Sequence, residues 1–255
     1  MPRFQISILL VLLAIGCATP AHTTALVDEA DVYRQRADRA MDAGSHDAAA
    51  AAYAESFLLY REGLEMASDL LEAEGGPPNA RLAQYRAHAL EALPGTAHLA
   101  AEAYSELGLR LWREANAKYD HGRLREAATL YEQSISSFVA EERWLREFLH
   151  HIAAEGEWSD SQSHQEERWS IQSDIAQVEK DRKAVALNLA LTIRRAHKED
   201  PTVAKQILDG LVVGLGFFGT ALEQVGMVLL AIITEPAFWE ILRICVEVAC
   251  CFGGS

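Results

Sequence analysis

Residues 44–53 read GSHDAAAAAY, and residues 122–131 read GRLREAATLY. Both stretches have a glycine, an alanine five residues later and a tyrosine nine residues later, and GTAHLAAEAY at residues 95–104 repeats the spacing. The glycine permits a tight turn, the alanine permits close helix approach, and the tyrosine fills the space beside it. The pattern therefore predicts helical hairpins. The residues that define it are Gly44, Ala49 and Tyr53; Gly95, Ala100 and Tyr104; and Gly122, Ala127 and Tyr131.

The rest of the chain is also typical of helices. Alanine is abundant, β-branched residues are sparse before residue 200, and no segment alternates for long with period two. Glycine, proline and polar clusters predict the breaks, one of them at Pro94-Gly95-Thr96. The expected helices are residues 25–43, 46–73, 80–93, 97–119, 123–154, 165–199, 202–233 and 237–252. Antiparallel neighbours joined by short turns predict an all-α fold.

Two of these helices, 123–154 and 165–199, are long and are expected to pair. Apolar residues recur along both in steps of three and four, which is the spacing of a core-facing stripe. The stripes are Tyr131, Phe138, Leu145, Leu149 and Ile152 on the first, and Ile171, Ile175, Val178, Val185, Leu189 and Ile193 on the second. The polar loop between them allows an antiparallel arrangement.

Residues 201–255 are expected to form a hydrophobic C-terminal helical segment. Its apolar runs on either side of Glu223-Gln224 are each too short to span a bilayer. The last helix, 237–252, is amphipathic, with Phe238, Leu242, Cys245, Ala249 and Phe252 on one stripe and Glu240, Arg243 and Glu247 opposite. The sequence leaves three arrangements open: packing against the preceding helices, burial in a homo-oligomer, or contact of 202–252 with a membrane.

The N-terminus has the features of a secretory signal. Arg3 supplies a positive charge, residues 6–15 are apolar, and the small Gly16 precedes Cys17. The end of this stretch, LAIGC, resembles the bacterial lipobox, whose cysteine is lipidated and becomes the first residue of the mature protein. The resemblance implies a signal peptide at 1–16, acylation (palmitate) of Cys17 and a tether at 17–25. The alternative is an ordinary signal peptide followed by an unrelated cysteine.

The glycine-alanine-tyrosine pattern resembles the second half of the tetratricopeptide repeat. The turn glycines are separated by 51 and 27 residues, whereas that repeat has a period of 34. The middle copy departs furthest, with Gln84, His88 and Glu91 in the preceding helix. The resemblance implies a degenerate tetratricopeptide-like array over 26–154, on which the loop and long helix of 155–200 pack back. The alternative is a generic alanine-rich bundle.

Composition and motifs restrict the functional classes. The chain has 37 Asp+Glu against 23 Lys+Arg, a net charge of −14 that disfavours binding to nucleic acid. It contains no nucleophile elbow, zinc-protease, phosphate-loop or dinucleotide motif. Glu147 and His150 form a single E-x-x-H, whereas a di-iron bundle needs two. Cys245, Cys250 and Cys251 lack the spacing of zinc ligands. The sequence therefore predicts a protein that is not an enzyme and has neither metal nor cofactor.

The tetratricopeptide resemblance implies binding to a protein partner of the cell envelope. Such lipoproteins act as docking adaptors for assembly or transport systems, and the first helix of each hairpin lines their groove. On this chain the groove residues would be Arg34, Asp38 and Met41 from the first hairpin, and Trp112, Asn116 and Tyr119 from the third. Ala18, where an inner-membrane lipoprotein has aspartate, favours an outer-membrane anchor facing the periplasm. The alternative is a membrane component that acts through its C-terminal helices.

Overall fold

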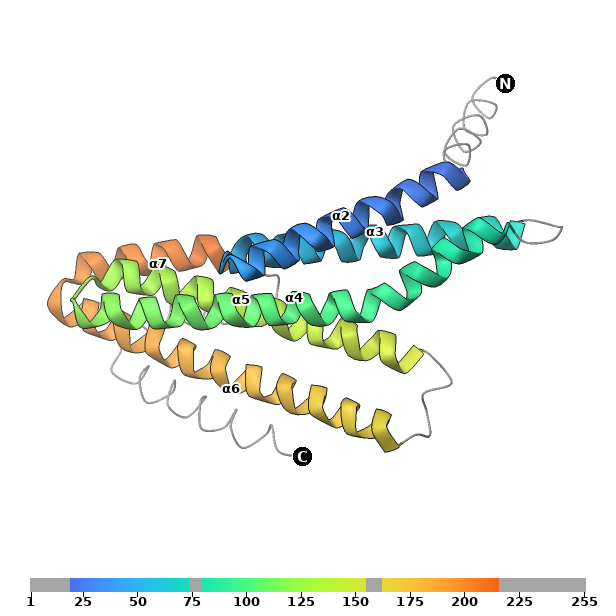
Figure 1. Cartoon of the computed structure of the whole chain (residues 1–255). Helices are drawn as coiled ribbons and strands as arrows, with labels where there is room; N and C mark the ends of the chain where they lie inside the picture. Colours follow the sequence, from blue (N-terminus) through green and yellow to red (C-terminus); the bar gives the residue numbers. More distant parts are fainter. Residues whose placement is uncertain (1–18, 74–78, 155–161, 216–255) are drawn as a thin grey trace, which may run out of the picture. The chain divides into compact units, whose positions relative to one another are not determined.

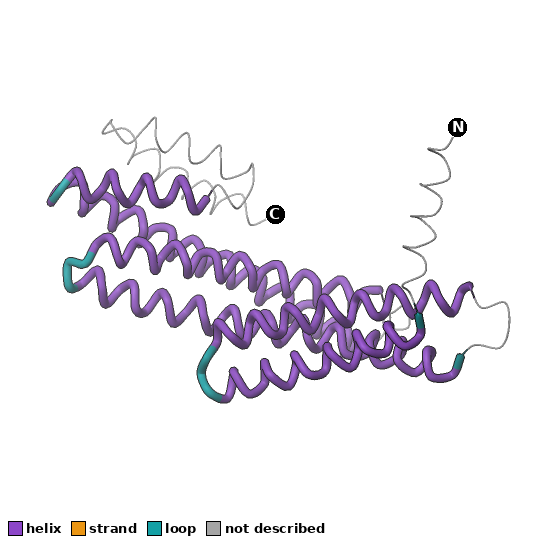
Figure 2. Tube along the Cα trace, turned by 90° about the horizontal axis from the view of Figure 1, so that it is seen from above, coloured by secondary structure: helices purple, strands orange, loops and turns teal. Residues whose placement is uncertain are grey.

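The computed structural model describes residues 19–73, 79–154 and 162–215, and within these ranges it contains helices and no strand (Figure 1). The helices are α2 (Pro20–Asp42), α3 (His46–Ala73), α4 (Ala80–Asp120), α5 (Leu124–Ala154), α6 (Gln162–Glu199) and α7 (Pro201–Leu215). Figure 2 shows short turns between α2 and α3, between α4 and α5, and between α6 and α7. The predicted all-α fold is confirmed for this part of the chain.

The helices divide into two compact units. Unit 1 contains the residues up to Leu109 together with Ser137–Glu179, and unit 2 contains Arg110–Ser136 together with the residues from Lys180 onward. Helices α2 and α3 therefore belong to unit 1 and α7 to unit 2, while α4, α5 and α6 each contribute residues to both.

The start of α2 is fixed by its own sequence. Thr19 caps the helix, because its side-chain oxygen accepts a hydrogen bond from the backbone N–H of His22 at 3.2 Å. Pro20 follows at the first position, where its missing N–H removes no helical hydrogen bond. The helix consequently begins five residues before its predicted start at residue 25.

Gly44 and Gly122 make the two turns that the pattern predicts for them. Both have a positive φ, 69° and 73°, a conformation that glycine adopts without steric cost. Gly44 N–H donates to Met41 O at 2.9 Å, and Ser45 N–H to Ala40 O at 2.8 Å. At the second turn, Gly122 N–H donates to Tyr119 O at 3.0 Å, and Arg123 N–H donates to Lys118 O at 2.9 Å. This is the Schellman arrangement, and it ends α2 and α4 in the same way.

The predicted helix break at Pro94-Gly95-Thr96 is wrong, because α4 continues through it. Gly95 therefore makes no turn, and the middle copy of the pattern forms no hairpin. Pro94 cannot donate to the preceding turn, which costs roughly 3 kcal/mol in a helix interior. Burial of the apolar residues around it offsets this cost, since Leu93, Ala97 and Ala100 are 0% exposed. Figure 1 shows α4 bent rather than straight, as proline-containing helices usually are.

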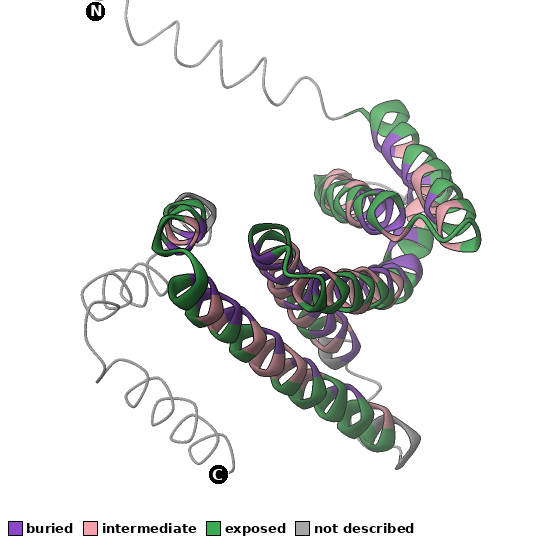
Figure 3. Cartoon of the chain, turned by 90° about the vertical axis from the view of Figure 1, so that its left-hand side faces the viewer, coloured by how far each residue is buried: buried purple, intermediate pink, exposed green. Residues whose placement is uncertain are grey.

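The core of unit 1 forms where α5 packs against α3 and α4. The Phe57 and Trp144 rings meet edge to face, with centroids 4.9 Å apart. His98 and Phe148 lie 5.0 Å apart. Gly108 faces Phe138 so closely that a Cβ at this position would come within 2.9 Å of the ring. Figure 3 shows buried positions running along one side of the helices. These contacts hold long helices together through aromatic residues and a glycine.

Unit 2 combines parts of α4, α5, α6 and α7. The buried apolar residues come from all four helices: Ala115 from α4; Leu124, Ala127 and Tyr131 from α5; Val185, Leu189 and Ile193 from α6; and Ala204, Ile207 and Leu211 from α7. Along both long helices the predicted stripes are mostly buried, with only Leu149 and Ile175 partly exposed. The periodicity therefore identified the core faces of α5 and α6.

Helix α7 is described as far as Leu215. The remaining residues of the predicted helices 202–233 and 237–252, and Glu223 between the apolar runs, lie outside the described residues. Within the described ranges, no helix combines the length and the apolarity that crossing a bilayer requires.

Candidate functional site

The two glycine turns each carry the same side-chain tie. Tyr53 Oη donates to Asp38 Oδ1 at 2.7 Å, and Tyr131 Oη donates to Asn116 Oδ1 at 2.6 Å. In both hairpins the acceptor lies six residues before the turn glycine and the tyrosine lies nine residues after it. Both tyrosines are 2% exposed. Burial raises the pKa of Tyr131 to about 12, and burial together with the Asp38 carboxylate raises the pKa of Tyr53 further. Each phenol therefore stays protonated and donates.

Removing either tyrosine hydroxyl should destabilise its hairpin. We expect Tyr53→Phe and Tyr131→Phe each to lower the free energy of unfolding by about 1–2 kcal/mol, because each removes the hydrogen bond that a buried tyrosine makes between the two helices of its hairpin. Chemical denaturation monitored by circular dichroism measures the change. Tyr104→Phe is the matched control, since Tyr104 is only partly buried and follows no turn. An equal loss in all three variants would show that these ties have no special role.

A row of aspartates marks one flank of α2 in unit 1. Asp28, Asp31 and Asp38 are spaced by three and seven residues, so their side chains lie along the same side of the helix. Helices α3 and α4 supply the donors: Tyr60 Oη donates to Asp31, and Tyr85 Oη donates to Asp28 at 3.4 Å. We call Asp28, Asp31, Gln35 and Asp38 the acidic flank. Its carboxylates are held in place by tyrosines and remain partly open to solvent.

His88 of α4 joins the same cluster. Its Nε2 lies 3.1 Å from Asp31 Oδ1, and its ring meets the Tyr60 ring edge to face at 5.9 Å. The side chains of His88 and Asp31 are 46% and 39% exposed, so the pair is accessible from solvent. Burial, reinforced by the Asp31 carboxylate, raises the pKa of Tyr60. Sequence reasoning missed Asp28, Asp31 and His88 as site residues.

The predicted groove residues of the first hairpin lie on or beside the acidic flank. Asp38 is part of it and is exposed, while Arg34 and Met41 are half-buried. A Cβ placed on Gly95 would lie 3.9 Å from Arg34 Nη2, which is an ordinary van der Waals distance, so the guanidinium lies beside this position of α4. The Arg34 guanidinium therefore extends from α2 toward α4. On α2 itself, Asp31 precedes Arg34 and Asp38 follows it.

The predicted groove residues of the third hairpin lie in unit 2, where Asn116 and Tyr119 contact residues of α5 and α6. Asn116 accepts from Tyr131, and Asn188 Nδ2 lies 3.5 Å from the same oxygen. The carbonyl of Tyr119 accepts from Arg195 at 3.0 Å, and the guanidinium stacks over its ring at 4.9 Å. Trp112 is half-buried. Asn116 is exposed and Tyr119 is half-buried, so this set is as open to solvent as the first one.

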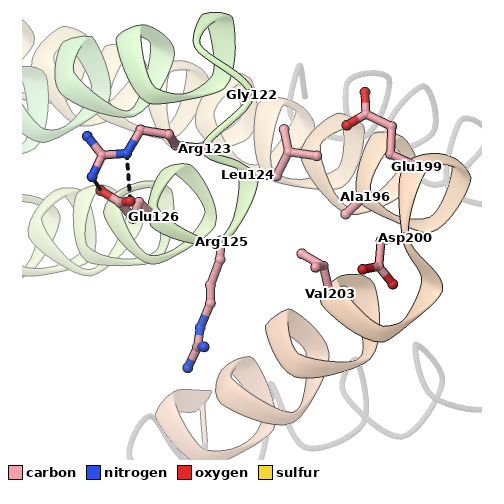
Figure 4. Close-up of a pocket in the computed structure, with 9 residues that line it drawn as sticks. All are labelled: Gly122, Arg123, Leu124, Arg125, Glu126, Ala196, Glu199, Asp200 and Val203. Carbon is pink, nitrogen blue, oxygen red and sulfur yellow. Dashed lines mark hydrogen bonds and ion pairs between the residues drawn. The ribbon is translucent and has the colours of Figure 1, made fainter.

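Unit 2 also contains a shallow cleft of about 280 Å³ (Figure 4). The start of α5 and the junction of α6 with α7 line it, and the lining residues are Gly122 to Glu126, Ala196, Glu199, Asp200 and Val203. Arg123 pairs with Glu126 at 2.6 Å, and Glu199 pairs with Arg195 at 2.7 Å. Both signs of charge are present and several groups are already paired. The cleft therefore shows no selectivity for a particular ligand.

Among the described residues, no three His, Cys, Asp or Glu side chains come together as metal ligands. His151 packs against the Phe57 ring at 5.5 Å, and burial lowers its pKa, which favours the neutral form. Cys17, Cys245, Cys250 and Cys251 lie outside the described residues.

Comparisons of the chain with protein-family models, with curated proteins and with solved structures found no match.

Proposed function

We propose that this protein is a non-catalytic, lipid-anchored adaptor of the bacterial cell envelope that binds a segment of a protein partner along the acidic flank of α2. The arrangement of Asp28, Asp31 and Asp38 carries the proposal. These carboxylates are oriented by tyrosine hydroxyls from the neighbouring helices, yet they stay accessible. A preformed polar surface loses little conformational entropy when it binds, which favours recognition over catalysis.

The tetratricopeptide-like character of the hairpins supports the same function. Two hairpins share the Schellman turn and the tyrosine tie, and α2 is the first helix of the first hairpin. In the repeat that they resemble, this helix lines the groove. A partner segment carrying Lys or Arg side chains would complement the three aspartates electrostatically. The lipobox-like residues before Cys17 support an anchor that places this surface in the periplasm.

The test removes the charge of the acidic flank without removing its hydrogen bonds. Asn116 already occupies the position equivalent to Asp38 and accepts from Tyr131, so asparagine can replace aspartate there. We therefore expect the full-length variant Asp28→Asn/Asp31→Asn/Asp38→Asn to stay helical. We expect its partner binding to fall at least about tenfold, which corresponds to roughly 1.4 kcal/mol.

Site-specific photo-crosslinking in cells measures this loss. A photoreactive residue replaces Gln35, which is exposed on the acidic flank, and the matched control replaces Glu29, which is exposed on the opposite flank. The expected product forms from position 35, not from position 29, and weakens in the asparagine variant. Equal products from both positions, or a product that the variant leaves unchanged, would contradict the proposal.

A further inference from the structure

Helix α6 is apolar on two sides over residues 184–193. This stretch reads AVALNLALTI and contains no charged residue. Val185, Leu189 and Ile193 form the buried side, with exposed fractions of 0%, 9% and 6%. A helix at the surface of a protein normally presents polar residues on its opposite side, whereas a helix that is apolar all round is normally buried.

The opposite side of this stretch is exposed in unit 2. Leu187 and Leu191 are 45% and 43% exposed, and they lie one turn apart with Ala190 beside them. Basic residues flank them along the same side of the helix, with Lys180 and Lys183 before and Arg194 and Lys198 after. We call this surface the outer face of α6. Leu187 and Leu191 are spaced as the residues through which one helix packs against another.

The chain itself carries a segment suited to this face. Forty residues follow Leu215, the last described residue of α7, and α7 belongs to the same unit as the outer face. Among them, 237–252 has a single apolar stripe from Phe238 to Phe252 with Glu240 and Glu247 opposite. A stripe of this length covers roughly 21 Å as a helix. The residues between Leu215 and 237 extend up to roughly 70 Å, so the segment can reach the outer face.

Charge favours this segment over a second copy of the chain. A two-fold dimer through the outer face would bring its two basic ends against each other, which like charges oppose. The segment 237–252 instead has two glutamates and one arginine, so it has no excess of basic residues that the basic ends of the outer face would repel. Its apolar stripe would cover Leu187 and Leu191 and leave its glutamates toward solvent.

We propose that residues 237–252 bind the outer face of α6 as an amphipathic helix, with the stripe around Cys245 against Leu187 and Leu191. This interaction is separate from the acidic flank of unit 1 and does not depend on the adaptor function. It assigns the hydrophobic C-terminus to the protein's own core rather than to a bilayer.

Disulfide formation across the proposed contact tests it in the full chain. The background carries Cys17→Ser, Cys250→Ser and Cys251→Ser, so that Cys245 is the one native thiol left. Leu187→Cys and Leu191→Cys are added separately, and each purified monomer is oxidised at low concentration. We expect an intramolecular disulfide with Cys245 in at least one of the two variants, identified by mass spectrometry of the digested protein.

The matched control moves the C-terminal thiol to the other side of the segment, by Cys245→Ser with Glu247→Cys. A disulfide requires Cα atoms within about 4.4–6.8 Å, so we expect at least about tenfold less bridging in the control. Circular dichroism verifies that the exposed substitutions leave the helices intact. Bridging between two chains, equal bridging in the control, or no bridge from either position would overturn the proposal.

A second readout uses the native chain without added cysteines. Arg243 lies within the segment, so trypsin cleaves there only when the segment is accessible. We expect Leu187→Lys/Leu191→Lys to accelerate cleavage at Arg243, while Lys205→Gln, an exposed substitution on α7 away from the outer face, leaves it unchanged. Cleavage at the same rate in the unaltered chain and in the lysine variant would also overturn the proposal.

Discussion

Replacing Phe57 with alanine should lower the free energy of unfolding by about 3–5 kcal/mol, the range for removing a large aromatic residue from a packed core. Phe57 is 1% exposed and lies where α3 meets α5. Its ring contacts the Trp144 ring edge to face, with centroids 4.9 Å apart and planes at 78°, and it also contacts His151. The substitution removes these contacts and leaves a cavity that rigid helices cannot fill.

Urea unfolding followed by tryptophan fluorescence and by circular dichroism measures this loss, because Trp144 lies beside the cavity. Leu58→Ala is the matched control, since it removes an apolar side chain from the next position of α3 that is 41% exposed. We expect a loss within about 0.5 kcal/mol for this surface position. Comparable losses in both variants would show that Phe57 is not part of the core.

The glycine turns show what local sequence can and cannot predict. Gly44 and Gly122 make the expected turns, whereas Gly95 has the same spacing to its alanine and tyrosine and lies inside α4. Pro94 and Gly95 together are a strong local signal for a break. Leu93, Ala97 and Ala100 are nevertheless fully buried, and their packing depends on other helices. The packing of these residues against other helices outweighs the local preference for a break. The spacing of glycine, alanine and tyrosine does not reveal this packing.

The acidic flank shows the same limit for site residues. The resemblance to the tetratricopeptide repeat implies Asp38 as a groove residue, because Asp38 lies on the first helix of a hairpin, and a hairpin is a local feature of the sequence. The contacts of Asp31 with His88 and of Asp28 with Tyr85 join residues 57 positions apart on α2 and α4. No motif connects residues so far apart in a chain. One signal in the sequence could have identified the aspartates. They are spaced by three and seven residues, and residues with this spacing lie on one side of a helix.

Replacing Cys17 with serine should abolish incorporation of a fatty-acid analogue completely, because the thiol is the atom that a lipobox cysteine provides for acylation. Serine preserves the size and polarity of the position but supplies no sulfur. Acyl chains contribute about 0.8 kcal/mol of membrane affinity for each buried CH₂ group, so their loss should also shift the protein from the membrane fraction to the soluble fraction. Metabolic labelling with an alkyne fatty acid, followed by fractionation, measures both effects.

The control for this prediction is Cys245→Ser, which removes a thiol of the C-terminal segment and leaves Cys17 in place. We expect unchanged labelling in this variant, since Cys245 follows no apolar run of a signal sequence. Labelling that persists in Cys17→Ser would contradict the lipoprotein interpretation and with it the envelope location. Loss of label together with full retention in the membrane fraction would instead show that a second element holds the protein there.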